Sequence, residues 1–294
     1  MYLKWVGGKS QLAKKLICKF PKKIEKYIEP FAGSASMFFC YHPGFTDEEM
    51  CFQLDTPNLP EVMLYDLNPH LINCHKIVRD KVDDLISKLK TLEEEHNSKK
   101  TIEDATEYYV SIRDMVTEPI TNLNSIDLAS YFVYINKTCF NGIWRVNRKG
   151  TNNVPFNQKL KIGFDTKSIY LASRMLSKCH IEHSSFEKLD IRKSDKETFV
   201  YMDPPYYPIS KTSNFTSYNS NKVNDMTLLQ SLKSFCKKLD IEGIKWMMSN
   251  NLTEEVVEEF KDWKIEKIQA HRFVKALKNN ENREKIEEVV IRNY

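Results

Sequence analysis

The sequence has no run of eighteen apolar residues, and its first fifteen residues, MYLKWVGGKSQLAKK, contain no apolar signal-peptide core. A helix that spans a bilayer needs about 20 predominantly apolar residues, and an export signal needs an apolar segment close to its start. We therefore expect neither a membrane-spanning segment nor secretion, and we predict that the protein acts inside the cell.

Paired cysteines and strong net charge are also lacking. The cysteines are odd in number and widely spaced, with no CxxC pair: Cys18, Cys40, Cys51, Cys74, Cys139, Cys179 and Cys236. Disulfide frameworks and zinc sites show even counts or close pairs, so we expect reduced core thiols and no bound metal. A net charge of +4 is too small to indicate a partner by itself.

Apolar runs are present at a length typical of strands, at residues 26–31, 62–66, 198–203, 244–249 and 287–292. Helical patterns follow most of them, as at 225–239 and 253–263. Strands that alternate with helices predict an α/β sheet covered on both faces. Ligands of such sheets bind at the carboxyl ends of the strands, where Glu29, Asp66 and Asp203 fall.

The middle of the chain has a different pattern. Residues from about 69 to 138 look mostly helical, with a charged, solvated helix or connector at 80–100 and an apolar-rich helix at 125–139. The stretch that follows, 140–161, has Gly, Asn and Pro and little periodicity. We predict a helical domain with a functional loop, inserted into the α/β domain. A polar stretch at 42–61 looks like a surface insertion, for which a lid, a partner site and a neutral loop are the alternatives, and we favour the neutral loop.

Asp203-Pro204-Pro205-Tyr206 is the sharpest motif. Two prolines end the preceding strand and fix a stiff, extended turn. The Asp203 carboxylate and the Pro204 carbonyl can each accept a hydrogen bond from an exocyclic amine such as adenine N6, which stabilises the charge that develops when this amine is alkylated. Tyr206 can stack on a flipped base. The alternative is a plain Pro-Pro turn, and we favour the function.

Three weaker motifs sit at other turns. Gly33, in the segment EPFAGS, permits close approach of a ligand, and Ser34 is predicted to cap the next helix. Asp66 can accept hydrogen bonds from ribose hydroxyls or can cap a helix. Gly7-Gly8 can wrap closely around a ligand or form a simple terminal turn.

The loop at 137–161 contains six Lys and Arg residues and no acid. Such residues neutralise phosphates, arginine reads guanine and asparagine can read adenine. Two interleaved aromatic residues, Phe140 and Trp144, are expected to be exposed, and Phe140 could insert between bases. A solvated basic surface is the alternative, but the combination favours nucleic acid.

Together these motifs resemble the DNA adenine methyltransferase (Dam) family in its alpha arrangement, the D12 class. The family pattern is KWxGGK, EPFxG, DxN, FNGxxRxNxxGxxNVPF, DPPY and an RNY-like end. This chain matches it, in order, at residues 4–9, 29–33, 66–68, 140–156, 203–206 and 292–294. The family's second glycine of FxGxG is replaced by Ala35, which is small enough for cofactor binding to survive.

The resemblance implies a Rossmann-like methyltransferase domain at 1–68 plus 166–294, and a mostly helical target-recognition domain at 69–165. It implies S-adenosylmethionine as donor and duplex DNA, with the site GATC, as the partner of a monomer. The catalytic residues would be Asp203, Pro204, Pro205 and Tyr206. The cofactor site would be lined by Trp5, Gly8, Lys9, Phe31, Gly33, Asp66 and Asp203. DNA contacts would come from Lys4, Phe140 as the wedge, Asn141, Ile143, Arg145, Asn147, Arg148 and Pro155.

Other chemistries stay open to different degrees. Methylation of cytosine C5 is disfavoured, because that reaction needs an activated cysteine and the sequence has no Pro-Cys pair. N4-cytosine methylation uses a similar amine and a similar turn, and methylation of RNA bases is a second alternative. An inactive DNA-binding relative is a third, which the intact Asp203 and Tyr206 disfavour.

Overall fold

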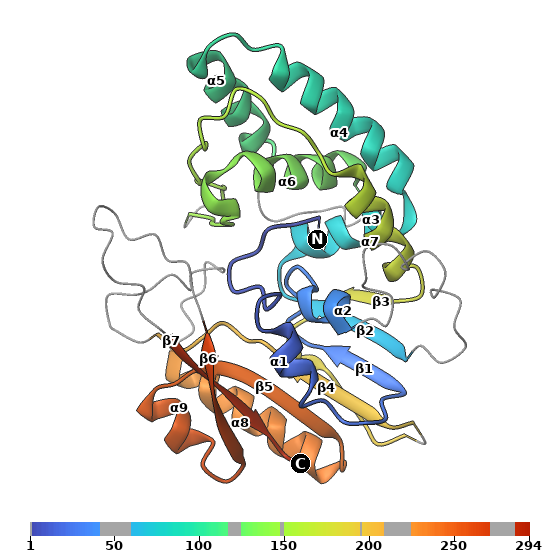
Figure 1. The fold of residues 1–294 in the computed structure, drawn as a ribbon, viewed down its shortest axis with the longest axis vertical. Coiled ribbons are helices and arrows are strands. Elements are labelled where there is room, and N and C mark those ends of the chain that lie inside the picture. The colour runs from blue at the N-terminus through green and yellow to red at the C-terminus, as the bar shows by residue number, and fades with distance from the viewer. Residues whose placement is uncertain are drawn as a thin grey trace.

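The computed structural model describes residues 2–41, 60–116, 125–147, 150–194, 196–208, 225–270 and 286–294. Most of the expected insertion at 42–61, and Arg148 among the expected DNA contacts, lie outside these ranges. A sheet and its covering helices form one end of the molecule and a group of helices forms the other, with the N-terminal segment between them (Figure 1).

The described residues form one seven-stranded sheet in the order β3-β2-β1-β4-β5-β7-β6. The strands are β1 (Lys26–Glu29), β2 (Glu61–Asp66), β3 (His180–His183), β4 (Thr198–Met202), β5 (Lys245–Asn251), β6 (Lys264–Ala270) and β7 (Ile286–Arg292). The first five in this order are parallel, whereas β7 is antiparallel to both of its neighbours. The five predicted strands and the α/β fold class are confirmed.

Each face of the sheet is covered by its own hydrophobic core, because successive side chains of a strand point to opposite faces. On β4, Phe199 and Tyr201 join one core, whereas Val200 and Met202 join the other. The first core includes residues of α1 (Ala13–Ile17), α2 (Ser36–Tyr41), α3 (Pro69–Asp80) and α7 (Thr166–Leu176). The second includes residues of α8 (Asp225–Ile241) and α9 (Glu254–Glu259).

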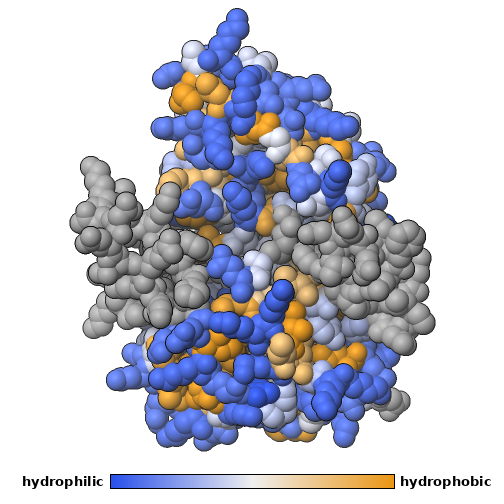
Figure 2. All heavy atoms as spheres, in the orientation of Figure 1, coloured by the Kyte–Doolittle hydropathy of each residue, from blue (hydrophilic) through white to orange (hydrophobic). Residues whose placement is uncertain are grey.

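The helical end consists of α4 (Val82–Asn97), α5 (Ile102–Asp114) and α6 (Ile126–Thr138), as the middle of the sequence predicts. The charged helix α4 is solvated on only one side, since Leu85, Leu89 and Leu92 bury its other side. Helix α3 contacts β2, β3 and α6 and therefore joins this end to the sheet. On the face drawn in Figure 2, hydrophilic residues predominate over the helical end.

The described ranges contain free thiols but neither a membrane-spanning helix nor a metal-binding cluster. Within them, no helix has both the length and the apolar character needed to cross a bilayer. The same residues contain no cluster of His, Cys, Asp and Glu suited to a metal ion. Six cysteines are described and all are free thiols, four of them buried. Cys18 is exposed, so its assignment to the core is wrong.

Glu29 ends β1 inside the protein. Its side chain is only 2% exposed, and one carboxyl oxygen accepts a hydrogen bond of 2.6 Å from the Tyr27 hydroxyl. Burial raises the pKa of Glu29 to about 8, because the ionised form loses its hydration, and the nearby charge of Asp203 acts in the same direction. Glu29 is therefore a neutral structural acid at pH 7.

This burial makes the free energy of unfolding depend on pH. Between the ordinary pKa near 4.5 and the folded value of about 8, the folded state holds a proton that the unfolded state releases. Stability attributable to Glu29 therefore falls as pH rises through this window, by at most about 1.4 kcal/mol per pH unit. We expect Glu29→Gln to flatten the slope, measured by urea unfolding at pH 5, 6, 7 and 8. Parallel slopes for the two proteins would contradict this.

Candidate active site and DNA interface

The predicted site residues follow neighbouring parallel strands. The turn to Gly33 follows β1, Asp66 ends β2, and Asp203 follows β4 directly. β1 is paired with both β2 and β4, and the strand order reverses between β1 and β4. This is the switch point at which open α/β sheets bind ligands, so the topology brings these three motifs together.

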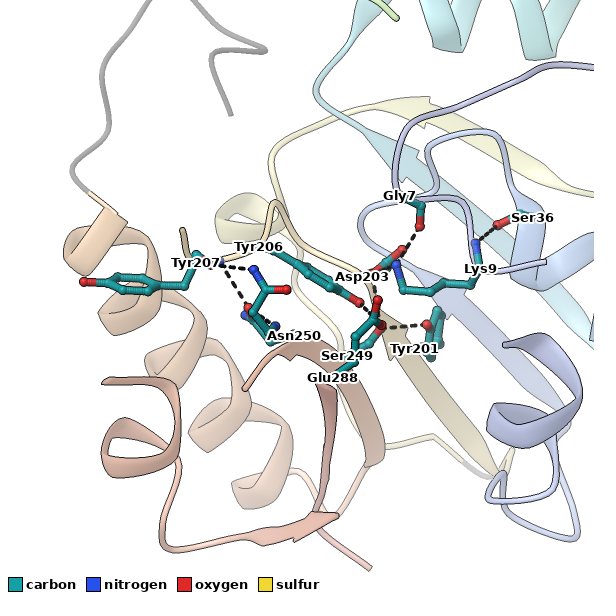
Figure 3. A network of polar contacts seen from close by, with 11 residues as sticks. Gly7, Lys9, Ser36, Tyr201, Asp203, Tyr206, Tyr207, Ser249, Asn250 and Glu288 are labelled. Carbon is teal, nitrogen blue, oxygen red and sulfur yellow. Dashed lines mark hydrogen bonds and ion pairs between the residues drawn. The ribbon is translucent and has the colours of Figure 1, made fainter. Parts of the chain in front are cut away.

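The N-terminal segment completes this group through Lys9. Its ammonium lies 2.9 Å from Asp203 Oδ1 and donates to the Gly7 carbonyl at 2.6 Å. The backbone N–H of Lys9 donates to the Ser36 hydroxyl at 3.0 Å, which ties the segment to the start of α2. Lys9 is 3% exposed and Asp203 is 20% exposed, so water screens this ion pair only weakly. Figure 3 shows the arrangement.

Side chains of β5 and β4 support Asp203 through a chain of hydrogen bonds. Ser249, on β5, donates to Asp203 Oδ1 at 3.1 Å, and the Tyr201 hydroxyl lies 2.8 Å from the Ser249 oxygen (Figure 3). Burial raises the pKa of Asp203, and the charge of Glu288 adds to this effect, whereas Lys9 and the Ser249 hydrogen bond oppose it. Among the described residues, Lys9 and Ser249 both bind Asp203 through the same oxygen, Oδ1.

Tyr206 shares one partner, Lys9, with Asp203 and has a second partner in Glu288. Its hydroxyl donates to Glu288 Oε2 at 2.9 Å, and Lys9 Nζ lies 4.5 Å from the centre of its ring. A cation over an aromatic face is attractive, so Lys9 contacts both Asp203 and Tyr206, the two candidate catalytic side chains of the motif. Glu288, on β7, is 3% exposed.

The chain that leaves the motif is also fixed. The Tyr207 N–H donates to the Asn250 amide oxygen at 3.1 Å, and the Asn251 amide donates to the Tyr207 carbonyl at 2.7 Å. The sequence analysis did not identify Glu288, since a glutamate in an apolar strand gives no indication of its partner. Strands β5 and β7 therefore hold the motif and the residue after it by hydrogen bonds, through Ser249, Asn250, Asn251 and Glu288.

The expected cofactor residues meet above β1 and β2. Asp66 accepts the Gly33 N–H on Oδ2 and the Asn68 N–H on Oδ1, both at 2.8 Å. The side chain of Asn68, rather than Asp66, caps α3, so the helix-cap interpretation of Asp66 is wrong. Gly33 has φ +52°, and a Cβ there would lie 3.1 Å from the Trp5 ring. The indole of Trp5 therefore lies directly against this turn.

The remaining cofactor candidates lie around the same turn. The Gly8 N–H donates to the Trp5 carbonyl at 3.1 Å, and Phe31 packs on Phe186 with ring centres 5.0 Å apart. Helix α2 begins at Ser36, so the prediction that Ser34 caps it is wrong. The reason is Ala35, which takes the left-handed conformation with φ +54°.

The basic loop is a short hairpin, although its sequence shows no strand pattern. Val146 and Asn152 form an antiparallel bridge, and Asn147 and Thr151 form a backbone hydrogen bond of 2.9 Å. The Asn147 side chain accepts the Thr151 N–H at 3.1 Å. Asn147 therefore stabilises the turn of this hairpin, which we call the recognition hairpin (residues 145–153).

Exposure around the recognition hairpin differs between residues. Phe140 is 53% exposed, as a wedge requires. Asn141, Arg145 and Pro155 are exposed and Ile143 is half-buried. Trp144 is only 4% exposed, so its prediction as an exposed aromatic residue is wrong. Its ring packs on Phe132 and on His70, at 4.8 and 5.1 Å.

Lys4 joins the DNA candidates through the N-terminal segment. Its N–H donates to the Asn136 amide oxygen at 2.9 Å, and the Asn136 amide donates to the carbonyls of Lys4 and Gly142 at 2.6 and 3.3 Å. Asn136 belongs to α6 and was not identified from the sequence. It brings exposed Lys4 beside the basic loop.

The helical end supports the loop from behind. The Tyr109 hydroxyl donates to the Val154 carbonyl at 2.8 Å, and its ring stacks on Phe156. His96 lies 2.8 Å from the Lys159 carbonyl and 2.7 Å from the Tyr134 hydroxyl. Helices α4 and α5 therefore hold the loop that carries the expected DNA contacts.

Comparison with known proteins gives consistent matches. Residues 5–274 match the family model of the D12 class N6 adenine-specific DNA methyltransferase. The chain is 34% identical to the type II methyltransferase M.MjaIII of Methanocaldococcus jannaschii, over 100% of this chain and 98% of that protein. It is 32% identical to the type II methyltransferase M1.LlaDCHI of Lactococcus lactis subsp. cremoris, over 100% and 95%. It is 28% identical to the DNA adenine methylase of Haemophilus influenzae, over 98% and 92%.

The contact between Lys4 and Gly142 can be tested by substitution. Gly142 has φ +66°, and an added Cβ would lie 2.8 Å from the Lys4 Cβ, which cannot move without its backbone. We expect Gly142→Ala to lower the free energy of unfolding by about 1–2 kcal/mol from the left-handed backbone alone, measured with urea. Gly243→Ala is the control, since Gly243 has φ +65° and its Cβ would meet nothing within 4 Å, so it shares the backbone cost without the contact. Gly142→Ala should lose more stability than this control, and equal losses in the two variants would refute the contact.

Proposed function

The chain belongs to the D12 class of N6 adenine-specific DNA methyltransferases, and on that basis we propose that it transfers a methyl group from S-adenosylmethionine to adenine N6 within duplex GATC. The target base is flipped out of the helix before transfer. Residues 1–68 and 166–294 carry out the chemistry, and residues 69–165 recognise the target. The family match favours adenine over the N4-cytosine alternative.

The observation that carries the proposal is the fixed geometry of Asp203 after β4. Lys9 and Ser249 both bind Oδ1, and this leaves Oδ2 to accept one N6 hydrogen while the Pro204 carbonyl accepts the other. These two acceptors draw the nitrogen lone pair out of the ring and stabilise the positive charge that develops on N6. N6 bonds to the methyl carbon as the carbon–sulfur bond breaks, and a proton then leaves N6 toward Asp203 or water.

The residues around Gly33 fit the donor. Asp66 accepts backbone hydrogen bonds from Gly33 and Asn68, and since a carboxylate has about four lone-pair sites, it can also accept from ribose hydroxyls. Trp5, beside Gly33, and Phe31 supply apolar surface, and the charge of Asp203 favours a cation nearby. When bound, the sulfonium supplies an electrophilic methyl group. The residues of this chain orient the methyl donor and exclude water from it.

DNA contacts come from the exposed residues of the basic loop and from Lys4. Phe140 inserts between bases, Lys4 and Asn141 contact the duplex near it, and Arg145 reads a guanine. Ile143 and Pro155 contact bases through apolar surface. Arg148, outside the described residues, and Asn147 are assigned to the same interface from their place in the loop.

The direct test is incubation of the enzyme with plasmid DNA and S-adenosylmethionine that carries a labelled methyl group. Sequencing that detects modified bases then identifies both the base and the site. We expect N6-methyladenine in GATC and no label with Asp203→Ala. Asp203→Asn, which keeps an acceptor for Lys9, and surface Asp190→Ala separate catalysis from folding. Wild-type activity in Asp203→Ala would refute the assignment of Asp203 as a catalytic residue.

Ser249 should set the acid side of the pH–rate profile. Activity requires ionised Asp203, so it falls as pH falls through the pKa of Asp203, which burial raises. Ser249→Ala removes a hydrogen bond that favours the ionised form. The acid limb of kcat/KM should then move to higher pH, with Thr253→Ala, at the start of α9, as the control. An unmoved limb would show that Ser249 does not act on Asp203.

A further inference from the structure

Arg145 and Asn153 face each other across the recognition hairpin. The Asn153 N–H donates to the Arg145 carbonyl at 3.2 Å, so the two residues form a cross-strand pair. The Arg145 side chain returns to the same partner: Nε donates to Asn153 Oδ1 at 2.7 Å, and Nη2 donates to the Asn153 carbonyl at 3.1 Å. Both side chains are exposed.

These two bonds occupy one specific edge of the guanidinium. An arginine has five N–H donors in a rigid plane, and they form two edges that can each donate two parallel hydrogen bonds. The side edge consists of Nε and Nη2, and Asn153 accepts from both of its nitrogens. The outer edge, formed by Nη1 and the second hydrogen of Nη2, points away from Asn153.

We propose that Asn153 is a positioning residue that commits Arg145 to read guanine through its outer edge, Nη1 to one acceptor and Nη2 to the other. Guanine presents O6 and N7 as adjacent acceptors in the major groove. This inference rests on the proposed function, in which Arg145 contacts a guanine. Asn153 acts through Arg145 and fixes which edge meets the base.

The support behind Asn153 makes this orientation stable before DNA arrives. The next residue, Val154, has its carbonyl bound by Tyr109 and donates its N–H to the Asn152 amide oxygen at 3.0 Å. An arginine that is already oriented loses less rotamer freedom on binding. Discrimination at the guanine therefore depends on Asn153, whereas general attraction to phosphates does not.

The test uses duplexes in which each guanine of the methylated site is replaced in turn. 7-Deazaguanine lacks the N7 acceptor and 2-aminopurine lacks O6. A bidentate contact corresponds to about five- to 150-fold in kcat/KM, and the wild-type enzyme should lose a part of this with either analogue. We expect Asn153→Ala to reduce the ratio of guanine to analogue by about threefold or more at one guanine only.

Two further variants define the cause. Asn153→Asp keeps an acceptor for Nε, so it should retain the discrimination while its charge weakens DNA binding uniformly. Asn157→Ala removes an amide of the same loop that contacts Lys137 and Lys159 instead, and it should keep the wild-type ratio.

The failures of the two proposals are distinguishable. If Asn153→Ala lowers kcat/KM by the same factor on guanine and on both analogues, Asn153 contacts the DNA backbone and the positioning role is overturned. If Arg145→Ala keeps wild-type discrimination at every guanine, Arg145 is not the guanine reader, and both that part of the proposed function and this inference fall.

Discussion

The ion pair between Lys9 and Asp203 is the contact on which the rest of the site depends. Both groups are largely buried, and removal of one partner from such a pair costs about 3–5 kcal/mol, because the other charge is left without compensation. Lys9 also lies over the Tyr206 ring, so one cation contacts both candidate catalytic side chains of the motif. A site assembled in this way needs little rearrangement when charge develops in it.

The N-terminal segment carries this cation and also connects the two ends of the molecule. Lys4 is bound by Asn136 of the helical end, and five residues later Lys9 is bound at the sheet. Trp5 lies between them, against Gly33 on one side and 6.1 Å from the Phe132 ring on the other. The candidate catalytic residues and the candidate DNA contacts are therefore linked by a short segment that contains one turn, closed by the hydrogen bond from the Gly8 N–H to the Trp5 carbonyl.

Local patterns predicted most of the fold, because each confirmed strand is an apolar run and each confirmed helix has its own periodicity. The strand β3 has one buried residue in the sequence HIEH, so its place in the sheet comes from pairing with β2 and not from its own composition. The site was predicted where motifs end strands, as at Asp66 and Asp203. The burial of Trp144 was not predicted. Its ring packs between Phe132 of α6 and His70 of α3, and these two helices are distant from each other in the sequence.

Polar residues that support a candidate site residue carry less sequence signal than the site residue itself. Asp203 and Arg145 are predicted from their residue types, a carboxylate and a guanidinium. The sequence pattern places Asp203 at a strand end and Arg145 in a basic loop. Ser249, Glu288 and Asn153 are ordinary polar residues whose roles exist only once a particular oxygen lies within 3.1 Å of its partner. Such roles follow from strand register: β5 beside β4, β7 beside β5, and residue 153 opposite residue 145. A shift of one residue in any of these pairings would turn the side chain to the opposite face, so the register of these three pairings sets the geometry of both the candidate active site and the candidate DNA interface.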